Sequence, residues 1–549
     1  MRWRKYIFPL LALAAMIIFV AYPVLTVASR SLSVNGHLSF GNYVSIFTDP
    51  HLFRAVWQSA GVAIAAAVIS TFLGLVIALT VIKTRLPLRR LFGVSAFLPM
   101  IIPGFVSTLA FIFLFGRNGL ITYHLLNIIP DVYSWKSVLI IQTVDFTTVA
   151  FLIISAVLWN IDSRPEDAAR SLGASEWRVL TDVTLPLLRP GIIASMLLIF
   201  MRSMADFGTP QLVGGRFSTL ASASYNQLIN SYNIEMSAAL NAVLLVFCLI
   251  AFWLYGRSRG GESDVRMQSQ GTTQKPLELS RPVKGVMWGI CALFTGYVLL
   301  LLVSVFMAAT TKYLGSNYAF TTEYFTSIST RSLNGILNTV GVATLTAVLM
   351  SFLGVSLAYL LTRIEFRGRR LIDLLATLPF AIPGTLMGVG YILAFNKPPL
   401  LLTGTLVIVF VLIIIRELPL GLRSGVSVLT QQDRSVEDAA ASLGSSRIGT
   451  FFRIILPMAR PALLISAAYA FVSSIQTLGA IIFVITPGTK LLSIDVFETI
   501  SKGNIGLAAS LSVVMLLLSA IGVLAIFILS QGEHTGKWVR RLVTRTPPA

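Results

Sequence analysis

The sequence contains little charge for its length. Asp, Glu, Lys and Arg make up 12% of the 549 residues, whereas about a quarter of the residues in a soluble globular protein are charged. Apolar residues make up 55%, and the mean hydropathy is +0.81. This balance excludes a disordered chain, a fibrous chain and a soluble globular enzyme. It predicts a protein that crosses a membrane many times.

The residues that build disulfides, metal sites and nucleotide sites are also scarce. The two cysteines, Cys248 and Cys291, lie in apolar segments, and the four histidines are scattered without metal-site spacing. The stretch nearest to a phosphate-binding loop, GEHTGKW at 532–538, has one residue too few between its glycines and Trp where Ser or Thr should bind magnesium. We therefore expect no catalytic residues, no metal site and no cofactor in this chain.

Long apolar runs are what the sequence has in abundance. Twelve stretches are long and apolar enough to cross a membrane as helices. They are 7–28, 55–82, 91–115, 137–159, 191–213, 236–255, 285–309, 333–361, 371–395, 400–418, 462–485 and 505–530. The sequence thus predicts an all-α membrane protein with about twelve transmembrane helices.

The positive charge is distributed unevenly between the segments that join these helices. If the N-terminus lies inside, 31 of the 42 Lys and Arg residues fall in inner segments. Because cytoplasmic loops carry an excess of Lys and Arg, this bias predicts that both termini are cytoplasmic. The net charge of +19 then reflects membrane topology, and we do not expect a nucleic-acid partner.

The chain repeats itself. Residues 166–191, EDAARSLGASEWRVLTDVTLPLLRPG, recur 271 positions later as EDAAASLGSSRIGTFFRIILPMARPA, and residues 72–74 and 98–104 recur 280 positions later. We expect two homologous six-helix halves, 1–255 and 285–549, joined by a flexible cytoplasmic linker, 256–284. Parallel repeats imply a pseudo-two-fold axis along the membrane normal, with a substrate pathway between the halves.

The repeated block lies on a cytoplasmic loop between the fourth and fifth helices of each half, at 160–190 and 419–461. Its pattern predicts a short helix that starts near Ser163 or Ser435 and stops at Gly173 or Gly444. One interpretation is an amphipathic helix that only anchors the loop. Two copies in the same order on the same loop favour a docking site for a soluble partner.

Both blocks resemble the EAA loop of ABC importer permeases, and the resemblance covers nearly the whole chain. It implies the type I ABC importer permease fold in a bacterial inner membrane, with alternating access. It also implies a substrate-binding protein outside and two ATPase subunits inside, which hold ATP and magnesium. Each glutamate of the loop is expected to cap its helix or to pair with the ATPase. The ATPase-coupling residues that the resemblance implies are Glu166, Ala168, Ala169, Gly173, Glu437, Ala439, Ala440 and Gly444.

The stretch 205–209, Ala-Asp-Phe-Gly-Thr, resembles the ferric-iron permeases of such importers. Ferric iron is therefore the first substrate expected, with thiamine, a phosphonate, a sugar phosphate or a polyamine as alternatives. A secondary transporter driven by an ion is an alternative of another class, which the paired loops disfavour. Because no cluster of Asp, Glu and Tyr is apparent within the spans, we expect selectivity to lie mainly in the binding protein.

Charged residues inside the spans are candidate functional residues, because burying charge in a membrane is costly. Asp145 and Arg416 occupy equivalent positions and could form an ion pair between the halves, although Arg416 could instead reach the cytoplasmic surface. Arg202 and Asp206, four residues apart, share a helix face and either bridge each other or line the pathway. Their repeat equivalents, Ser473 and Thr477, extend this polar face to the second half.

Overall fold

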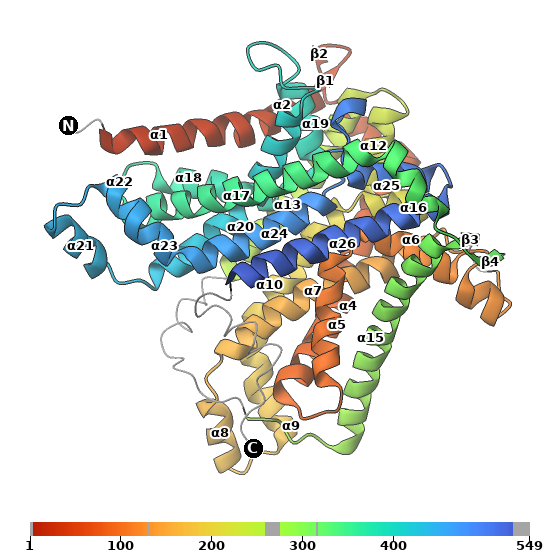
Figure 1. Ribbon diagram of the computed structural model, residues 1–549, viewed down its shortest axis with the longest axis horizontal. Helices are drawn as coiled ribbons and strands as arrows, with labels where there is room; N and C mark the ends of the chain where they lie inside the picture. The colour runs from red at the N-terminus through yellow and green to blue at the C-terminus, as the bar shows by residue number, and fades with distance from the viewer. Residues whose placement is uncertain (1–3, 130, 259–274, 314–316, 531–549) are drawn as a thin grey trace.

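The structure is a computed structural model that describes residues 4–129, 131–258, 275–313 and 317–530 (Figure 1). Within these ranges the chain is almost entirely helical. The only strands there form two short antiparallel hairpins, β1–β2 (Ser33–Val34, His37–Leu38) and β3–β4 (Thr311–Tyr313, Asn317–Phe320). The stretch 532–538 and most of the predicted linker lie outside the described residues.

Each half contains α-helices and short π- or 3₁₀-helical segments, which are labelled η. The first half contains α1 (Arg4–Met16), η1 (Ile17–Ala21), α2 (Tyr22–Ser31), α3 (Gly41–Thr48), α4 (Pro50–Lys83), α5 (Arg89–Ile101), α6 (Gly104–Phe115), η2 (Leu120–Leu125), α7 (Trp135–Asn160), α8 (Arg164–Ser171), α9 (Glu176–Arg178), η3 (Val179–Thr184), α10 (Leu185–Ala205), α11 (Gly208–Val213), α12 (Leu220–Ile229) and α13 (Ile234–Ser258). The second half contains α15 (Arg281–Thr310), α16 (Glu323–Arg331), α17 (Leu333–Arg363), α18 (Arg369–Thr377), η5 (Leu378–Phe380), α19 (Gly384–Ala394), α20 (Leu406–Thr430), α21 (Ser435–Ser442), α22 (Arg447–Thr450), η6 (Phe451–Ile455), α23 (Leu456–Met458), α24 (Arg460–Gln476), η7 (Pro487–Thr489), α25 (Leu492–Ser501) and α26 (Ile505–Ser530).

These helices confirm the predicted all-α membrane protein. In the described ranges, nine helices are long and apolar enough to cross a membrane, and eleven spans result when two sharply bent helix pairs are included. Helix α20 coincides with most of the remaining predicted span, 400–418, but carries Arg416, Glu417 and Arg423. These three charged side chains keep α20 out of that count.

Four predicted spans are interrupted, in two repeat-equivalent pairs. The spans expected over 91–115 and 371–395 break just before α6 and α19, at Pro103 and Pro383.

The other pair breaks further along each half. The continuous span expected over 191–213 is wrong, because α10 ends at Ala205 and α11 begins only at Gly208. The span expected over 462–485 is also wrong, because α24 ends at Gln476 and turns follow. In this pair the breaks fall at the repeat-equivalent residues Asp206 and Thr477, which both have extended backbone angles. Non-helical backbone at membrane depth is tolerated where protein or a watery cavity surrounds it.

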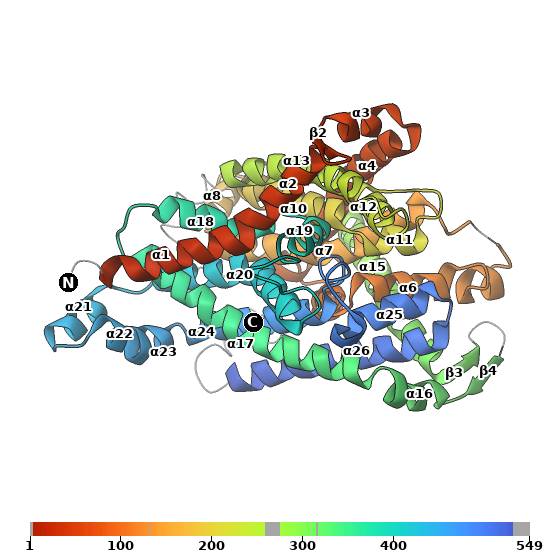
Figure 2. The ribbon, with the colours of Figure 1, turned by 90° about the horizontal axis from the view of Figure 1, so that it is seen from above.

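The two halves are interleaved (Figures 1 and 2). The first helices of the chain, α1 and α2, pack against α18 and α19 of the second half, while α15 packs against α4, α5 and α6 of the first. The Tyr391 hydroxyl donates to the Phe19 carbonyl oxygen at 2.8 Å, and the Ser95 and Thr295 hydroxyls are 2.7 Å apart. Each half therefore completes its packing with the first helix of the other.

Glycines let the central helices of each half cross closely. A methyl group on Gly74 of α4 would overlap Ala150 and the backbone of Phe151 in α7. At the equivalent crossing of α17 and α20, a methyl group on Gly354 would overlap the backbone of Gly421. Small residues at such crossings allow van der Waals packing between membrane helices. The repeat thus extends to the contacts between helices.

Candidate functional site

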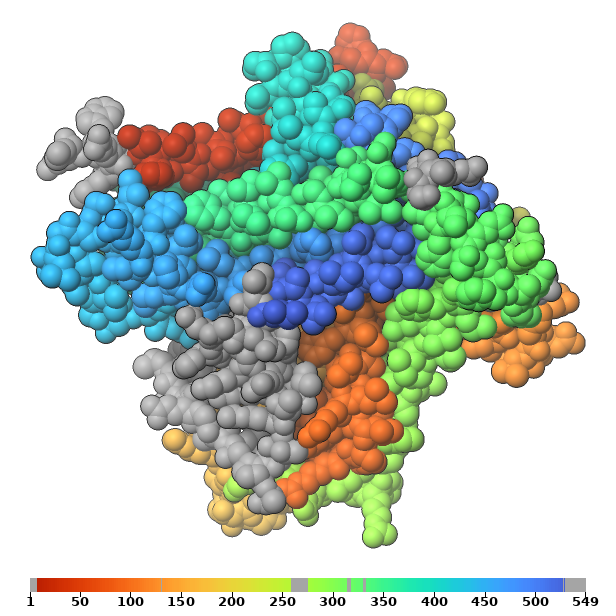
Figure 3. All heavy atoms as spheres, in the orientation of Figure 1, coloured from red at the N-terminus to blue at the C-terminus, as the bar shows by residue number. Residues whose placement is uncertain are grey.

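The repeated loops form two short helices, α8 and α21, that project from the body of the molecule (Figures 1 and 3). Each starts after an aspartate whose carboxylate accepts a backbone hydrogen bond two residues on: Asp162 from Arg164 and Asp433 from Ser435, both at 3.0 Å. Both helices start where predicted, near Ser163 and Ser435. These two hydrogen bonds fix the backbone conformation where each helix begins.

Glycines end both α8 and α21, as predicted. Gly173 and Gly444 have φ angles of +83° and +81°, in the left-handed region that favours glycine. In each copy the glycine N–H and the next N–H turn back to carbonyl oxygens of the last helical turn. A side chain at either glycine would meet no atom within 4 Å, so backbone conformation alone explains the residue type.

The glutamates of the two loops bind cations of this same chain. Glu166 is fully buried and accepts from Lys83 Nζ at 2.6 and 2.8 Å and from Thr184 Oγ1 at 2.9 Å. Glu437 lies 2.7 Å from Nε of Arg363. Lys83 and Arg363 are the last residues of the equivalent helices α4 and α17. The expectation that each glutamate caps its helix or pairs with an ATPase is therefore replaced by an internal tether.

One face of each of the helices α8 and α21 is exposed. Ala168 and Ala439 are exposed, while Ala169 and Ala440 turn inward. The following leucines, Leu172 and Leu443, are 88% and 89% exposed.

Two further apolar side chains, Trp177 and Ile448, are also exposed at equivalent positions. None of these four large side chains was among the ATPase-coupling residues that the resemblance implied. Their signal was an apolar residue recurring in an otherwise polar repeat. Exposed apolar side chains of this kind are typical of a surface that contacts a protein or a membrane.

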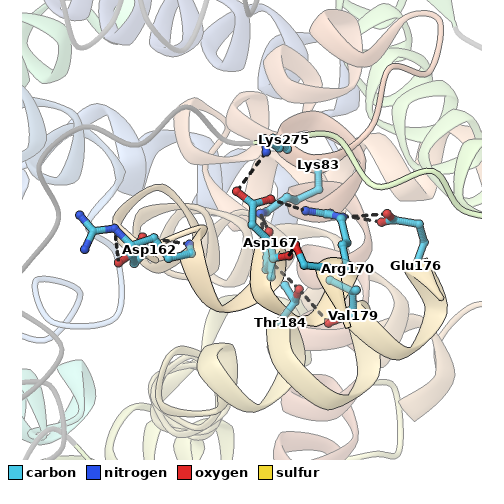
Figure 4. A network of polar contacts seen from close by, with 11 residues as sticks. Lys83, Asp162, Asp167, Arg170, Glu176, Val179, Thr184 and Lys275 are labelled. Atoms are coloured by element: carbon cyan, nitrogen blue, oxygen red, sulfur yellow. Dashed lines mark hydrogen bonds and ion pairs between the residues drawn. The ribbon is translucent and has the colours of Figure 1, made fainter. Parts of the chain in front are cut away.

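The first loop carries ion pairs that the second lacks (Figure 4). Arg170 lies 3.1 Å from Asp167 and 2.7 Å from Glu176. The equivalents of Arg170 and Glu176 are Ala441 and Arg447, which cannot form this pair. Helices α8 and α21 therefore share a shape but differ in the ion pairs that hold them.

A second group of polar residues lies within the membrane, where the halves meet. Arg202 of α10 donates to the Tyr469 hydroxyl of α24 at 3.0 Å, and Ser473 donates to Glu417 at 2.7 Å. The Glu417 carboxylate is close enough to act electrostatically on both Arg202 and Tyr469. We call Arg202, Glu417, Tyr469 and Ser473 the inter-half polar cluster. The Arg202 side chain is exposed despite this location.

The other two residues expected on this polar face have separate partners. Asp206 accepts from Gln142 at 2.8 Å, and Gln142 accepts from Ser203 at 2.6 Å. Asp206 therefore does not bridge to Arg202. Thr477 is buried, and its hydroxyl donates to the Ser473 carbonyl oxygen. Both residues stabilise the helix breaks instead of joining the cluster.

The ion pair expected between Asp145 and Arg416 is absent from this structure. Asp145 Oδ2 would lie 3.4 Å from a methyl group placed on Gly104, and Arg416 Nη1 would lie 3.4 Å from one on Gly384. Gly104 and Gly384 are repeat equivalents, so each charged side chain turns toward the same site in its own half. Arg416 Nε instead lies 3.8 Å from the carboxylate of its neighbour, Glu417.

The described residues contain no group of three or more His, Cys, Asp or Glu side chains that could hold a metal ion. Cys248 and Cys291 are buried and free. What the structure presents is two interleaved membrane halves, two projecting helices and a polar group between the halves. These features define a transport permease.

The chain belongs to the family of binding-protein-dependent transport system inner membrane components, which matches residues 70–259 and 351–532. It is thus the transmembrane permease subunit of an ABC importer, and both halves carry the family's domain. Members of this family work with a substrate-binding protein and an ATPase in the bacterial inner membrane. The chain is thus a transport subunit of such a system.

Several bacterial permeases are similar to this chain over most of its length. A Haemophilus influenzae protein that carries the name of a ferric transport system permease, FbpB 1, is 30% identical over 87% of this chain and 77% of its own. The ferric transport system permease FbpB of Actinobacillus pleuropneumoniae is 28% identical over 92% of this chain and 75% of its own. A Sinorhizobium fredii protein named as an ABC transporter permease, y4fN, is 26% identical over 95% of both chains.

Proposed function

We propose that this chain is the transmembrane permease of an importer for ferric iron. Two relatives named as ferric transport permeases, similar over 87% and 92% of the chain, support this substrate. The Ala205–Thr209 stretch agrees with it, and Asp206 of that stretch orders the break after α10. Iron is cargo here, handed over by a binding protein that carries most of the selectivity.

The duplicated coupling helix is the observation that carries the mechanism. Each of two ATPase subunits docks on one helix through the exposed face that contains Ala168 and Leu172 or Ala439 and Leu443. The ATPases hold ATP and magnesium and lie on the cytoplasmic side. The Lys and Arg distribution supports this orientation and cytoplasmic termini. The binding protein then docks on the opposite side, where the two β-hairpins lie (Figure 1).

Closure of the ATPases on ATP moves the two coupling helices. The Lys83–Glu166 and Arg363–Glu437 pairs carry that movement to α4 and α17, which reach through the membrane. Helices α10 and α24 carry it from the loops toward the inter-half polar cluster. A relative shift of the halves separates Arg202 from Tyr469 and opens the path inward.

The pathway runs between the halves past the inter-half polar cluster. Arg202 and Ser473 contribute to it directly, while Asp206 and Thr477 shape it by ending α10 and α24. Hydroxyl, carboxylate and guanidinium groups keep this region wet. A wet path lowers the cost of moving an ion through hydrocarbon.

Reconstitution tests the proposal. The tagged chain is purified from native membranes in mild detergent, and co-purified proteins are identified by mass spectrometry. Proteoliposomes with the complex and its loaded binding protein are then assayed for radioactive iron uptake, with and without ATP. We expect a co-purified ATPase and ATP-dependent uptake. Uptake of thiamine, a phosphonate, a sugar phosphate or a polyamine in place of iron would refute the substrate, and uptake without any ATPase would refute the coupling mechanism.

A further inference from the structure

The described end of the predicted linker is packed against the first coupling loop. The Leu277 N–H donates to the Lys83 carbonyl oxygen at 2.7 Å. Leu277 and Leu279 are buried in an apolar cluster that includes Leu180 and touches Ala169. The expectation of a flexible linker therefore fails for this part of it. The chain here adheres to the end of α4 and to the base of α8.

A side chain of the same segment reaches the coupling helix itself. Lys275 Nζ lies 3.1 Å from the Asp167 carboxylate, which also binds Arg170 (Figure 4). This hydrogen bond from Lys275 holds the pKa of Asp167 below its usual value. Asp167 directly follows Glu166, whose partner is Lys83. The linker thus contacts the backbone of Lys83 and the carboxylate of the residue that follows Glu166.

The second coupling helix has no such support in the part of the chain that the structure describes. Asp438, the equivalent of Asp167, forms no ion pair there, and Ala441 replaces Arg170. It is tethered to the end of α17 by the Arg363–Glu437 pair, which is partly exposed to solvent, and by a hydrogen bond from Arg434 to the Thr362 carbonyl oxygen. The two ATPase docking helices therefore differ in their support.

The supporting segment leads directly into the second half. Ser280 follows Leu279, and α15 begins at Arg281. Helix α15 then packs against α4 and α5 of the first half. The segment 275–279 thus connects the first helix of one half to the coupling helix of the other.

We propose that Lys275 and Leu277 are positioning residues for the first coupling helix, so that one ATPase docking site is held more firmly than the other. Through the segment 275–279, movement of α15 reaches the first ATPase site. The inference rests on the proposed role of α8 and α21 as ATPase docking helices. Its consequence is an unequal contribution of the two sites to transport.

Cysteine cross-linking tests the contact in the full chain. The double variant Lys275→Cys/Asp167→Cys is compared with Lys275→Cys/Asp438→Cys in native membranes under mild oxidation. The two native cysteines are buried in both variants. We expect the first variant to cross-link and the second not to. Equal cross-linking, or none in the first variant, would overturn the inference.

A transport assay tests the role of the contact. Lys275→Glu, the conservative Lys275→Arg and the control Arg281→Glu are each assembled with the ATPase and the iron-loaded binding protein in proteoliposomes. We expect Lys275→Glu to raise the ATP hydrolysed per iron transported by about two- to fivefold, the factor that one surface ion pair supplies. Lys275→Arg and Arg281→Glu should match the natural chain. Because complex assembly is quantified separately, loss of folding cannot produce this pattern.

The outcomes separate the two proposals. If the natural chain binds no ATPase, the proposed function fails, and the inference about the linker fails with it. If the natural chain binds ATPase and imports iron, but Lys275→Glu leaves the ATP hydrolysed per iron transported unchanged, only the role of the linker is refuted.

Discussion

Lys83 and Glu166 form an ion pair from which water is fully excluded, with Nζ and Oε2 2.6 Å apart. Its repeat, Arg363 with Glu437, has a 2.7 Å contact that solvent partly reaches. In both halves the cation ends a membrane span, and the glutamate lies in the first turn of α8 or α21. The pair therefore joins each projecting helix to a helix that crosses the membrane.

Removing one member of the buried pair should destabilise the protein strongly. Glu166→Ala leaves the Lys83 charge buried without a partner, which costs about 3–5 kcal/mol. Thermal unfolding in detergent measures the loss. The double variant Lys83→Met/Glu166→Leu is the control, because two apolar residues leave no buried charge and should recover most of the stability. A double variant as unstable as Glu166→Ala would contradict the argument.

Charge at the exposed leucines should abolish ATPase binding without unfolding the chain. Leu172→Asp and Leu443→Asp change side chains that touch little of their own protein, so stability should stay within about 0.5 kcal/mol. Co-purification of the ATPase measures the effect. The matched control is Leu38→Asp, since Leu38 is also 89% exposed but lies on the β-hairpin at the opposite side. ATPase binding that survives in the double leucine variant would refute docking through this face.

A methyl group at one helix crossing should be far more harmful than at another site in the same helix. Gly74→Ala forces α4 away from the backbone of α7 and should cost about 1–3 kcal/mol. Gly61→Ala meets no atom within 4 Å, and it should be neutral or stabilising because alanine favours helix. The amount of folded protein after detergent extraction distinguishes them. Equal yields would show that α4 and α7 are not tightly packed.

The hydrogen bond across the inter-half polar cluster should restrain the resting state. Tyr469→Phe removes only the hydroxyl that accepts from Arg202. We expect basal ATP hydrolysis, measured without binding protein, to rise by about three- to tenfold, since a hydrogen bond to a charged group contributes about 1.5–3 kcal/mol and this one is partly solvated. Tyr43→Phe, which removes a hydroxyl beside Ser31 outside the cluster, should leave the basal rate unchanged. An unchanged rate in Tyr469→Phe would refute the restraint.

The contact between the linker and α8 should be insensitive to pH in the neutral range. The pKa of Asp167 is held below its ordinary value of 3.8 by Lys275. A depressed pKa in the folded state stabilises the protein above the ordinary pKa and loses that effect as pH falls through the depressed value. The difference in unfolding temperature between the natural chain and Asp167→Asn should therefore be flat from about pH 8 to 5 and shrink only below about 4. A difference that disappears near pH 6 would contradict this assignment.

The sequence predicted the features that depend on composition and repetition. Apolar run length located the spans, and the repeated block located α8 and α21 with their terminal glycines. The exact boundaries of the two halves and the linker stay predictions. The helix breaks at Asp206 and Thr477 were not predicted. The average hydropathy of a segment does not show where the backbone hydrogen bonds of a helix end.

Contacts between distant segments were harder to predict. Glu166 finds its partner 83 residues upstream, and nothing in one sequence pairs them directly. The sequence did contain one indication of this pairing, because Lys83 and Arg363 are cations at repeat-equivalent positions. The same reasoning from equivalence was wrong for Asp145 and Arg416, since equivalent residues lie at symmetric places but need not touch.

The exchange of first helices between the halves has a consequence for how the protein is made. The Phe19 carbonyl oxygen and the Tyr391 hydroxyl that bind each other are 372 residues apart. Helices α1 and α2 therefore enter the bilayer long before α18 and α19 are synthesised, and they must wait beside lipid with part of their packing surface uncovered. The packing of the first half therefore cannot be completed until the second half has been synthesised. Both halves reach their final packing in the same late step of assembly.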